Sequence, residues 1–490
     1  MPGADPYDAR PYTAHAYVET HPGRLAAAAR LARGTPPPVE TARVLELGCG
    51  LGGNLLPMAA SLPRATLVGV DRSGRQIAEA RRAAAGAGLA NVRFVQASFE
   101  TMAIDAGAFD YVVAHGVLSW IPADLRATLF ERTAAALAPG GVACVSFNVL
   151  PGWYERLAAR DWLRFAGSFG VTPEGAVGSL DWLASQASPE LTDYRRRLGA
   201  VARRLEVTGA AHAAHEYMAP DQHAHLVTDV LAEAASAGLA YLGDATPQAV
   251  AVELLPGAAR DRARSLDRAG VEQLVDFVRA TAFRRALFVR ADGIERRPEL
   301  DPEAIAGLYL ASGLRTAEAA NPAAPEETFA DGDWAMPVAD AAARRALHHL
   351  AAVAPASLSF AELARELPAA AAPALARELF DVWLATGGLD VRADAPRFTA
   401  TPGDRPVACP LARWVAAEGG IVTSRLHHEV LIPDAIVSWV LVRLDGTRTR
   451  ADLAREARAL VTTGPPDDAE LARLVEACVS RLAACAVLVA

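Results

Sequence analysis

The 490-residue sequence contains no lysine, so all 48 of its Lys and Arg residues are arginine. Alanine is abundant by contrast, and glycine and proline number 37 and 32. Arginine in place of lysine, together with abundant alanine, glycine and proline, is the composition that a GC-rich genome produces. We therefore interpret the missing lysine as genome bias rather than as a functional device.

Cysteine is scarce as well, with five residues in the chain. Their number is odd and no two of them follow a CxxC spacing, so the sequence offers neither a disulfide framework nor a zinc knuckle. The sequence therefore predicts a cytoplasmic protein without a metal site. The five are Cys49, Cys144, Cys409, Cys478 and Cys485.

Long apolar runs and basic runs are also absent. No uninterrupted apolar stretch is long enough to cross a bilayer, and the first 18 residues lack the apolar core of a secretory signal. The formal net charge is -9. An acidic chain without a basic run argues against general nucleic-acid binding, because that affinity depends on neutralising phosphates. We expect neither a membrane span nor a nucleic-acid partner.

The first half of the chain alternates short apolar runs with alanine-rich amphipathic segments, which predicts a parallel sheet with helices on both faces. Residues 157–207 favour helices only, and two further strand-like segments follow. We predict one Rossmann-like, seven-stranded α/β domain with a helical insertion; a separate all-helical middle domain is the alternative. The strands are expected at 44–47, 66–70, 92–96, 111–114, 142–147, 239–242 and 286–289.

A glycine-rich turn follows the first predicted strand. Glycines at 48, 50 and 52 allow a tight turn and a close approach of a ligand to the backbone. The spacing G-x-G-x-G, with Glu46 two residues earlier, differs from the G-x-G-x-x-G of dinucleotide-binding proteins. An acid there would repel a pyrophosphate, but it suits a ligand with a positive ammonium or sulfonium group. Asp71 ends the second strand, where a carboxylate can accept both hydroxyls of a ribose.

These motifs resemble those of the class I S-adenosylmethionine-dependent methyltransferases. Residues 109–118 are similar to the fourth motif of that family, and 137–141 to the turn before its fifth strand. The resemblance implies S-adenosylmethionine as the cofactor. The third motif of the family usually ends in an acid that meets the adenine amino group, whereas this chain offers Ser98. The cofactor-binding residues that the resemblance implies are Glu46, Gly48, Cys49, Gly50, Gly52, Asn54, Asp71, Arg72, Ser98, Phe99 and His115.

A closer resemblance extends over nearly the whole chain. Its segments Thr20-His21-Pro22, His215-Glu216-Tyr217 and Leu444-Asp445-Gly446-Thr447-Arg448 are similar to those of a bacterial group with a methyltransferase regulatory domain and a C-terminal winged helix. That group includes protein-lysine methyltransferases acting on outer-membrane proteins. The resemblance implies methyl transfer to a protein side chain, with lysine as the first choice. Methylation of a small molecule and a non-catalytic scaffold are the alternatives.

The composition and the resemblance together predict the domain borders. Residues 1–35 are expected to form a lid over the cofactor, with plain N-terminal packing as the alternative. Residues 36–292 are expected to form the methyltransferase domain, with the insertion at about 155–215 and the regulatory region at about 210–292. Residues 293–338, rich in Pro, Glu, Asp and Gly, are expected to be a linker. Two winged-helix-like α+β modules are expected at 339–402 and 403–490. Neither of their recognition helices is strongly basic, which favours docking of a protein substrate on these modules and the insertion; the oligomeric state stays open.

The acceptor is expected over the carboxyl ends of the fourth and fifth strands. Trp120 and Trp153 could wall a slot for an amine, because aromatic faces attract cations; ordinary packing is the alternative. Asn148 could accept a hydrogen bond from the attacking amine. His115 is either a general base or, as the resemblance implies, part of the lining around the cofactor. These four residues are our predicted acceptor-site set.

Histidines at 212, 215, 223 and 225 lie close together in the sequence. No cysteine accompanies them, and their spacing is not that of a zinc protease. We interpret His215-Glu216-Tyr217 as a segment that packs the insertion onto the sheet, and His427-His428-Glu429 in the same way.

Overall fold

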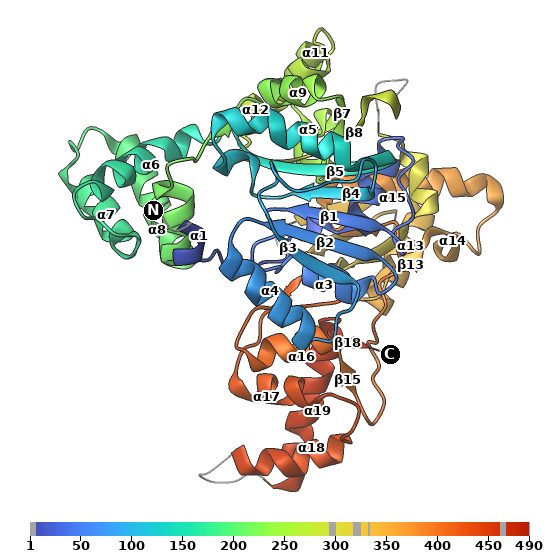
Figure 1. The fold of residues 1–490 in the computed structure, drawn as a ribbon. Helices are drawn as coiled ribbons and strands as arrows, with labels where there is room; N and C mark the ends of the chain where they lie inside the picture. The colour runs from blue at the N-terminus through green and yellow to red at the C-terminus, as the bar shows by residue number, and fades with distance from the viewer. Residues whose placement is uncertain (1–5, 294–299, 317–324, 332–333, 461–466, 490) are drawn as a thin grey trace.

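The computed structural model describes residues 6–293, 300–316, 325–331, 334–460 and 467–489 (Figure 1). Its centre is a sheet whose main path runs β3-β2-β1-β4-β5-β8-β7, with a short β6 paired to β5. The predicted seven-stranded α/β sheet is therefore confirmed. The strands are β1 (Arg43–Leu47), β2 (Thr66–Asp71), β3 (Val92–Gln96), β4 (Phe109–Ala114), β5 (Leu137–Val149), β6 (Ala224–His225), β7 (Leu239–Asp244) and β8 (Phe283–Arg290).

Strands β1 to β5 run parallel, and β8 runs antiparallel to both β5 and β7. The strand order reverses between β1 and β4, and a crevice forms at the carboxyl ends of parallel strands at such a point. Strands β1 and β5 are buried along almost their whole length because helices cover both faces of the sheet. The fold therefore provides a ligand site just beyond Glu46 and Ala114.

Each face of the sheet has its own apolar core. Leu25, Leu55 and Ile77 belong to the core on one face, and Phe130 and Val230 to the core on the other. The helices of this domain, including two short ones after β7, are α1 (Pro6–Ala9), α2 (Pro22–Leu31), α3 (Leu55–Ser61), α4 (Gly74–Gly86), α5 (Arg126–Ala136), α9 (Val227–Ser236), α10 (Pro247–Val250), α11 (Gly257–Ala263) and α12 (Arg268–Arg279).

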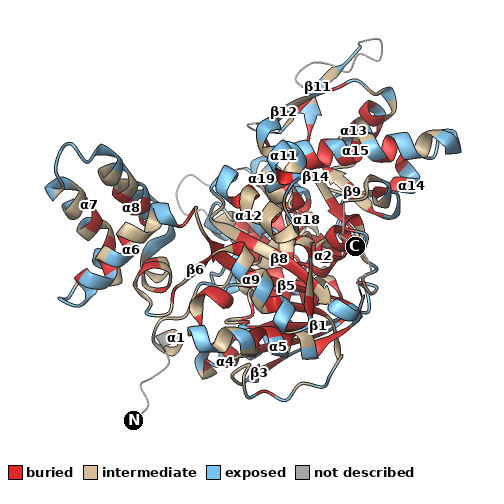
Figure 2. Cartoon of the chain, turned by 90° about the horizontal axis from the view of Figure 1, so that it is seen from above, coloured by how far each residue is buried: buried red, intermediate tan, exposed pale blue. Residues whose placement is uncertain are grey.

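The predicted helical insertion forms a lobe beside the sheet, at the left of Figure 1. It consists of α6 (Tyr154–Gly167), α7 (Ala176–Gln186) and α8 (Thr192–His212), followed by a π-helix (Ala213–Met218). Leu163, Leu180 and Leu198 form part of a small core of its own, and much of the outer surface of these helices is exposed (Figure 2). The chain then returns to the same sheet with β7 and β8, so the lobe is an insertion into one domain.

The segment 293–338 differs from the expected linker. Within its described residues, β9 (Tyr309–Ser312) is the middle strand of the sheet β13-β9-β14, and β10 (Arg315–Thr316), β11 (Glu327–Asp331) and β12 (Trp334–Val338) form a second antiparallel sheet. Leu310 and Phe329 are buried there. The expectation was wrong for these parts because the Pro-, Gly- and acid-rich composition marks turns between very short strands. Residues 294–299, 317–324 and 332–333 lie outside the described residues.

Two smaller units follow, and both combine helices with short strands as the sequence predicts. The first contains α13 (Ala341–Val353), β13 (Leu358–Ser359), α14 (Phe360–Leu363), α15 (Ala372–Thr386) and β14 (Leu389–Arg392). The second, the C-terminal domain, contains β15 (Val407–Ala408), α16 (Pro410–Ala417), β16 (Val422–Thr423), β17 (Glu429–Val430), α17 (Ala435–Arg443), α18 (Arg450–Ala457), α19 (Asp468–Ala484) and β18 (Leu488–Val489). No helix in the described parts of the chain has the length and apolar character that crossing a bilayer requires.

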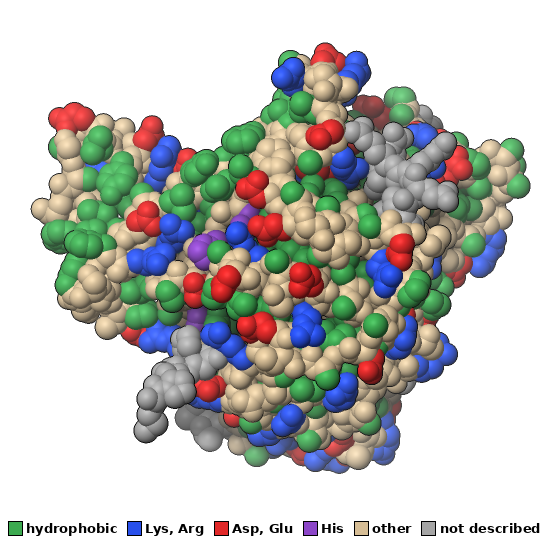
Figure 3. Space-filling view, turned by 45° about the horizontal axis from the view of Figure 1, so that its top comes forward, with side chains coloured by type: hydrophobic (Ala, Val, Ile, Leu, Met, Phe, Trp, Pro, Cys, Tyr) green, Lys and Arg blue, Asp and Glu red, His purple; other side chains and the backbone are tan. Residues whose placement is uncertain are grey.

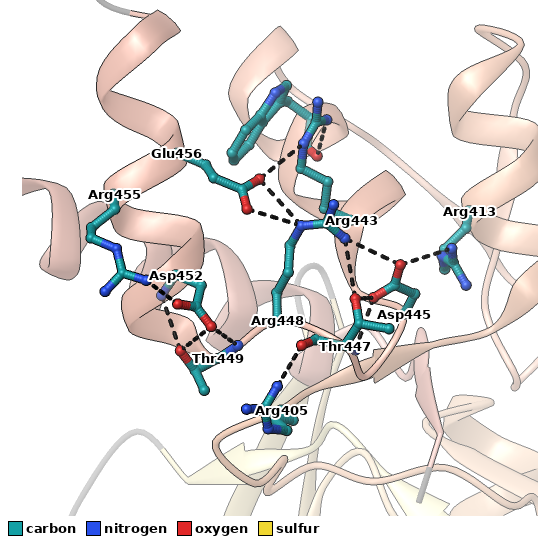
Figure 4. A network of polar contacts seen from close by, with 11 residues as sticks. Arg405, Arg413, Arg443, Asp445, Thr447, Arg448, Thr449, Asp452, Arg455 and Glu456 are labelled. Carbon is teal, nitrogen blue, oxygen red and sulfur yellow. Dashed lines mark hydrogen bonds and ion pairs between the residues drawn. The ribbon is translucent and has the colours of Figure 1, made fainter.

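The segment 444–448, part of the family resemblance, forms a turn in the C-terminal domain (Figure 4). Gly446 has a φ of 81°, and Asp445 accepts a hydrogen bond from the backbone N–H of Thr447 at 2.9 Å. Arg448 pairs with Asp445 at 3.2 Å and with Glu456 of α18 at 3.1 Å. The motif therefore stabilises the connection between α17 and α18 and lies outside the central sheet.

Candidate active site

A pocket of about 590 Å³ lies at the carboxyl ends of β1, β2 and β4. Its volume is within the range of about 300–1,000 Å³ that ligand pockets occupy. The N-terminal segment, the glycine-rich turn, the β5 end and the π-helix of the insertion all contribute to its walls. Figure 3 shows the surface hollowed between the helical lobe and the sheet domain, with histidine, arginine and acidic side chains gathered there.

The glycine-rich turn forms one wall of this pocket. The backbone N–H groups of Gly48 and Cys49 both donate to Val70 O, at 2.8 and 3.0 Å, and fasten the turn to the end of β2. Gly48 has a φ of 73°, and a Cβ there would lie 2.6 Å from the Val117 side chain. Glycine is therefore required at 48 for both conformation and space. The Cys49 thiol is buried, which raises its pKa well above the ordinary value, so it fills space and is not a nucleophile.

Gly52 is the exception among the predicted turn residues, because it does not line the pocket. It has a φ of 76°, and a Cβ there would lie 2.8 Å from the Phe94 ring. Its place is behind the turn, where it lets the turn pack against β3. The assignment of Gly52 to ligand contact is corrected accordingly.

Glu46 lies buried at the floor of the pocket, 3% exposed. Its Oε1 accepts a hydrogen bond from Asn54 Nδ2 at 2.7 Å, whereas its Oε2 is buried without a hydrogen-bond partner among the described residues. Burial raises the pKa of Glu46 to about 8, with the Asp71 charge adding to the effect and Asn54 opposing it. A buried carboxyl with one unpartnered oxygen at a pocket wall fits a ligand that carries a positive charge.

Asp71 lies at the carboxyl end of β2, as predicted. Its two oxygens accept hydrogen bonds from the N–H groups of Gly50 and Ser73, both at 2.9 Å. These bonds hold the carboxylate in place between two loops at the pocket wall. The neighbouring Arg72 also lines the pocket, with its guanidinium 5.5 Å from the centre of the Tyr7 ring.

The third predicted contact region, after β3, contains an acid that sequence reasoning missed. Ser98, Phe99 and Glu100 all line the pocket, and the Ser98 hydroxyl donates a hydrogen bond to the Glu100 carboxylate. The signal was present as an acid two residues beyond Ser98.

His115 lines the pocket between two aromatic rings. The Tyr17 ring lies 3.8 Å away between centroids, and the Phe283 ring 5.7 Å away. Burial, assisted by the Arg285 charge, lowers the pKa of His115 to about 3. Such an imidazole does not take up a proton near neutral pH. Its low pKa and its place between two rings favour the lining role over the role of general base. Tyr17 had not been singled out in the sequence.

The N-terminal segment passes over the pocket and contacts three parts of the molecule. Asp8 accepts from the Ser73 hydroxyl at 2.6 Å beside α4, and Arg10 pairs with Glu174 of the insertion at 2.7 Å. His15 lies 2.7 Å from Glu429 in β17 of the C-terminal domain. These contacts are compatible with the predicted lid, although residues 1–5 lie outside the described chain.

The far end of the pocket carries Asn148, Trp120 and Glu216. The Asn148 N–H donates to the Ser119 hydroxyl at 2.8 Å, and its side-chain Nδ2 is buried without a partner at hydrogen-bond distance in the described chain. Trp120 Nε1 donates to His215 O at 3.1 Å and so anchors the π-helix. Burial raises the pKa of Glu216 to about 7, opposed by Arg204 and by the neighbouring Arg156 and Asn148.

Glu216 and its arginine neighbours were not predicted as site residues. The sequence predicted that His215-Glu216-Tyr217 packs the insertion onto the sheet. Tyr217 does pack in this way, because its ring lies 6.0 Å from the ring of the buried Trp153. The wider turn of the π-helix directs Glu216 and His215 to the pocket instead. π-helical turns are frequent at functional sites, but no sequence pattern marked this one.

Trp153, predicted to line the acceptor site, lies elsewhere. Its side chain is fully buried under the insertion, and the Arg156 guanidinium lies 5.3 Å from the centre of its ring. It does not line the pocket, so the packing alternative holds. The reason is that α6 begins at Tyr154 and turns the indole beneath the helix.

The comparisons with known proteins agree with this geometry. Residues 44–141 match the model of a methyltransferase domain, 211–290 a predicted methyltransferase regulatory domain, and 404–467 the C-terminal winged helix domain of PKMT. The chain belongs to the methyltransferases with these domains. The predicted class, an S-adenosylmethionine-dependent methyltransferase, is thereby confirmed.

Relatives of this methyltransferase occur in several bacteria. It is 32% identical over 216 residues to uncharacterized protein RP028 of Rickettsia prowazekii (strain Madrid E), covering 43% of this chain and 86% of the relative. Uncharacterized protein RP789 of the same organism is 30% identical over 293 residues, 59% of this chain and 53% of the relative. The chain thus spans about half the length of RP789. Trans-aconitate 2-methyltransferase of Methylobacterium nodulans (strain LMG 21967 / CNCM I-2342 / ORS 2060) is 36% identical over 181 residues, 36% of this chain and 64% of the relative.

Among solved structures, the methyltransferase resembles PKMT2 from Rickettsia typhi with a TM-score of 0.85. The match covers 98% of this chain and 100% of that chain at 23% identity, and it includes a complex of PKMT2 with AdoHcy. At this identity the likeness establishes the fold. It therefore confirms the predicted architecture, from the Rossmann-like sheet to the C-terminal winged helix.

Proposed function

We propose that this methyltransferase transfers the methyl group of S-adenosylmethionine to the lysine side chain of a protein. The observation that carries the proposal is the presence of two carboxyls in the pocket, the buried Glu46 at its glycine-rich end and the half-buried Glu216 at its far end. Glu46 is suited to the ammonium group of the methyl donor, and Glu216 to the ammonium group of the acceptor. The PKMT winged helix domain and the fold shared with PKMT2 support a protein as the substrate.

The residues of the glycine-rich end would hold the methyl donor. Glu46 Oε2 would receive its ammonium group, Asp71 its ribose hydroxyls, and Ser98 with Glu100 its adenine amino group. S-adenosylmethionine supplies a methyl group already activated on a sulfonium, so the protein mainly aligns the reactants and excludes water. The three adjacent rings of Tyr17, His115 and Phe283 would exclude water from the pocket.

The far end would bind the lysine. Glu216 attracts its ammonium and, with a pKa of about 7, accepts the proton that the amine must lose before it attacks. The amine nitrogen then forms a bond to the methyl carbon while the carbon–sulfur bond breaks, and the sulfur leaves as a neutral thioether. Arg156 and Arg204 oppose the effect of burial on Glu216, which keeps its pKa near neutrality. Trp120 offers an aromatic face beside the amine.

A small carboxylic acid is the second candidate acceptor. Arg156, Arg204 and Arg285 all line the pocket, and guanidinium groups bind carboxylates in bidentate fashion. The partial similarity to a trans-aconitate 2-methyltransferase favours the same acceptor class. Under both candidates we expect a cytoplasmic enzyme; under the first, its protein substrate docks on the insertion and the winged-helix modules.

One labelling experiment tests the proposal. The protein is incubated with methyl-labelled S-adenosylmethionine and a lysate of its own organism, and protein-bound label is separated from small-molecule label. We expect protein-bound label that amino-acid analysis identifies as methyl-lysine. Label confined to small acids would support the second candidate, and protein-bound label on another residue type would contradict lysine.

A further inference from the structure

The hairpin that joins β16 to β17 in the C-terminal domain reaches into the methyltransferase domain. Its loop is closed by hydrogen bonds from Ser424 N to His428 O at 2.8 Å and from His427 N to Ser424 O at 3.0 Å. His427 has a φ of 67°, and its side chain is 1% exposed. The Arg425 guanidinium donates to Ala60 O in α3. We call this hairpin, residues 422–430, the wing; its tip packs against the methyltransferase domain of the same chain.

His427 makes its polar contact with the residue that orients Glu46. Its Nε2 donates to Asn54 Oδ1 at 2.8 Å, and Asn54 Nδ2 donates to Glu46 Oε1 at 2.7 Å. The imidazole is neutral because burial and nearby cations lower its pKa well below the ordinary value, so the proton of the contact resides on Nε2. Three buried side chains therefore form a chain from the wing to the floor of the pocket.

The other contacts of Asn54 come from the N-terminal segment. The Tyr17 N–H donates to Asn54 Oδ1 at 3.0 Å, and Asn54 Nδ2 donates to Thr20 Oγ1 at 3.0 Å. With donors from both Tyr17 and His427 on its oxygen, the amide must present its nitrogen to Glu46. The same wing also contacts this segment directly, through the 2.7 Å pair of Glu429 and His15.

We propose that His427 is a positioning residue of the cofactor site: the wing fixes the Asn54 amide and, through it, the Glu46 carboxyl that receives the ammonium of the methyl donor. The inference deepens the proposed function and rests on it. A winged helix used in this way makes the C-terminal domain a structural part of the cofactor site, 373 residues along the chain from Asn54.

The interface of the two domains also contains contacts that do not lead to the pocket, and these provide a matched control. Arg82 of α4 pairs with Glu418 at 2.8 Å, and its guanidinium lies 5.1 Å from the centre of the Trp414 ring. Both side chains of the Arg82–Glu418 pair are about half exposed. A variant of Glu418 weakens the docking of the domains without touching Asn54.

The test measures binding of S-adenosylhomocysteine by calorimetry to three full-length variants. His427→Asn keeps a residue type that tolerates a positive φ but is too short to reach Asn54. His427→Gln restores an N–H donor of similar reach, and Glu418→Gln is the control. We expect about tenfold weaker binding for His427→Asn, because the buried Asn54 oxygen loses one of its donors and the amide is held less firmly toward Glu46. His427→Gln should recover most of the lost affinity. Glu418→Gln should bind like the parent protein.

Kinetics separate positioning from general damage to the fold. In His427→Asn the KM for S-adenosylmethionine should rise by a similar factor while kcat changes less than twofold. Unchanged binding in His427→Asn would overturn the inference, as would equal loss in His427→Gln and His427→Asn. Absence of binding by the parent protein would instead overturn the proposed function. A thermal melt of each variant identifies losses that come from unfolding.

Discussion

At the scale of single residues, two carboxyl groups of the pocket have pKa values near neutrality because the fold buries them. Glu46 has a pKa of about 8 and Glu216 of about 7. The sequence predicted Glu46 and Asp71 as ligand contacts because Glu46 lies two residues before the first glycine of the turn and Asp71 ends the second predicted strand. Glu216 could not be assigned in this way, because its place depends on how the insertion packs over the sheet. Glu100, by contrast, has a local signal, since it lies two residues beyond Ser98 in the loop after β3.

The raised pKa of Glu46 gives cofactor binding a pH dependence. Below pH 8 the carboxyl holds a proton in the free protein and must release it to pair with an ammonium group, so affinity should increase as the pH rises towards about 8. Glu46→Gln removes this charge, and we expect about 10- to 100-fold weaker binding of S-adenosylhomocysteine with a flat pH profile. Calorimetry between pH 6 and pH 8, in buffers of different ionisation enthalpy, detects the released proton. A pH-dependent profile in Glu46→Gln would show that another group is responsible.

At the scale of elements, the π-helix and the N-terminal segment decide what the pocket contains. The π-helix follows α8 and places Glu216 beside Asn148, whereas a continued α-helix would present a different set of side chains there. The order of strands and helices could be predicted from hydrophobic periodicity, but this irregular turn could not. The same holds for Trp153, which the start of α6 places under the helix.

The role of the π-helix is tested by Glu216→Gln. Because Glu216 is proposed to accept the proton of the amine, kcat with the protein substrate should fall by about 100-fold or more. Binding of S-adenosylhomocysteine should stay unchanged, since Glu216 lies at the other end of the pocket. Glu155→Gln is a matched control, because Glu155 pairs with Arg197 on α8 and does not line the pocket. An unchanged kcat in Glu216→Gln would remove Glu216 from the mechanism.

A second prediction concerns how α12 is held on β8. Arg284 is completely buried and pairs with Glu272 at 2.7 Å and Asp276 at 2.8 Å. Arg284→Met would remove the arginine that pairs with the buried Asp276 and one of the two arginines that pair with Glu272, and we expect the free energy of unfolding to fall by about 3–5 kcal/mol. Arg196→Met, which removes an exposed pair with Asp193, should change it by less than about 1 kcal/mol. Urea denaturation of both variants measures the difference; a loss below 1 kcal/mol for Arg284→Met would contradict the prediction.

At the scale of the whole molecule, four parts of the chain meet at one pocket. The sheet domain supplies the glycine-rich turn and Asp71, and the insertion supplies Glu216. The N-terminal segment covers the pocket, and the C-terminal domain contacts Asn54 of the pocket wall through His427. The acidic net charge of -9 adds a general attraction for a lysine-bearing substrate.

The missing lysine makes a prediction for the molecule as a whole. If lysine is the acceptor, the enzyme has no side chain of its own to methylate, and only its α-amino group remains. Incubated alone with methyl-labelled S-adenosylmethionine, the chain should therefore carry no methyl-lysine, while a protein substrate added to it does. Mass spectrometry of the digested chain checks this. Side-chain label on the enzyme itself would show an acceptor other than lysine.

The sequence by itself determined the succession of strands and helices along the first half of the chain, the glycine-rich turn and the two acids, Glu46 and Asp71, because each depends on local backbone conformation and on the period of apolar residues. It also determined the class of ligand, since acids at those positions suit an ammonium and a ribose. Only the tertiary structure decided which residues lie at the far end of the pocket, that Trp153 is buried, and that His427 contacts Asn54. Those features join residues that are tens to hundreds of positions apart, and no local pattern specifies which of them pack together.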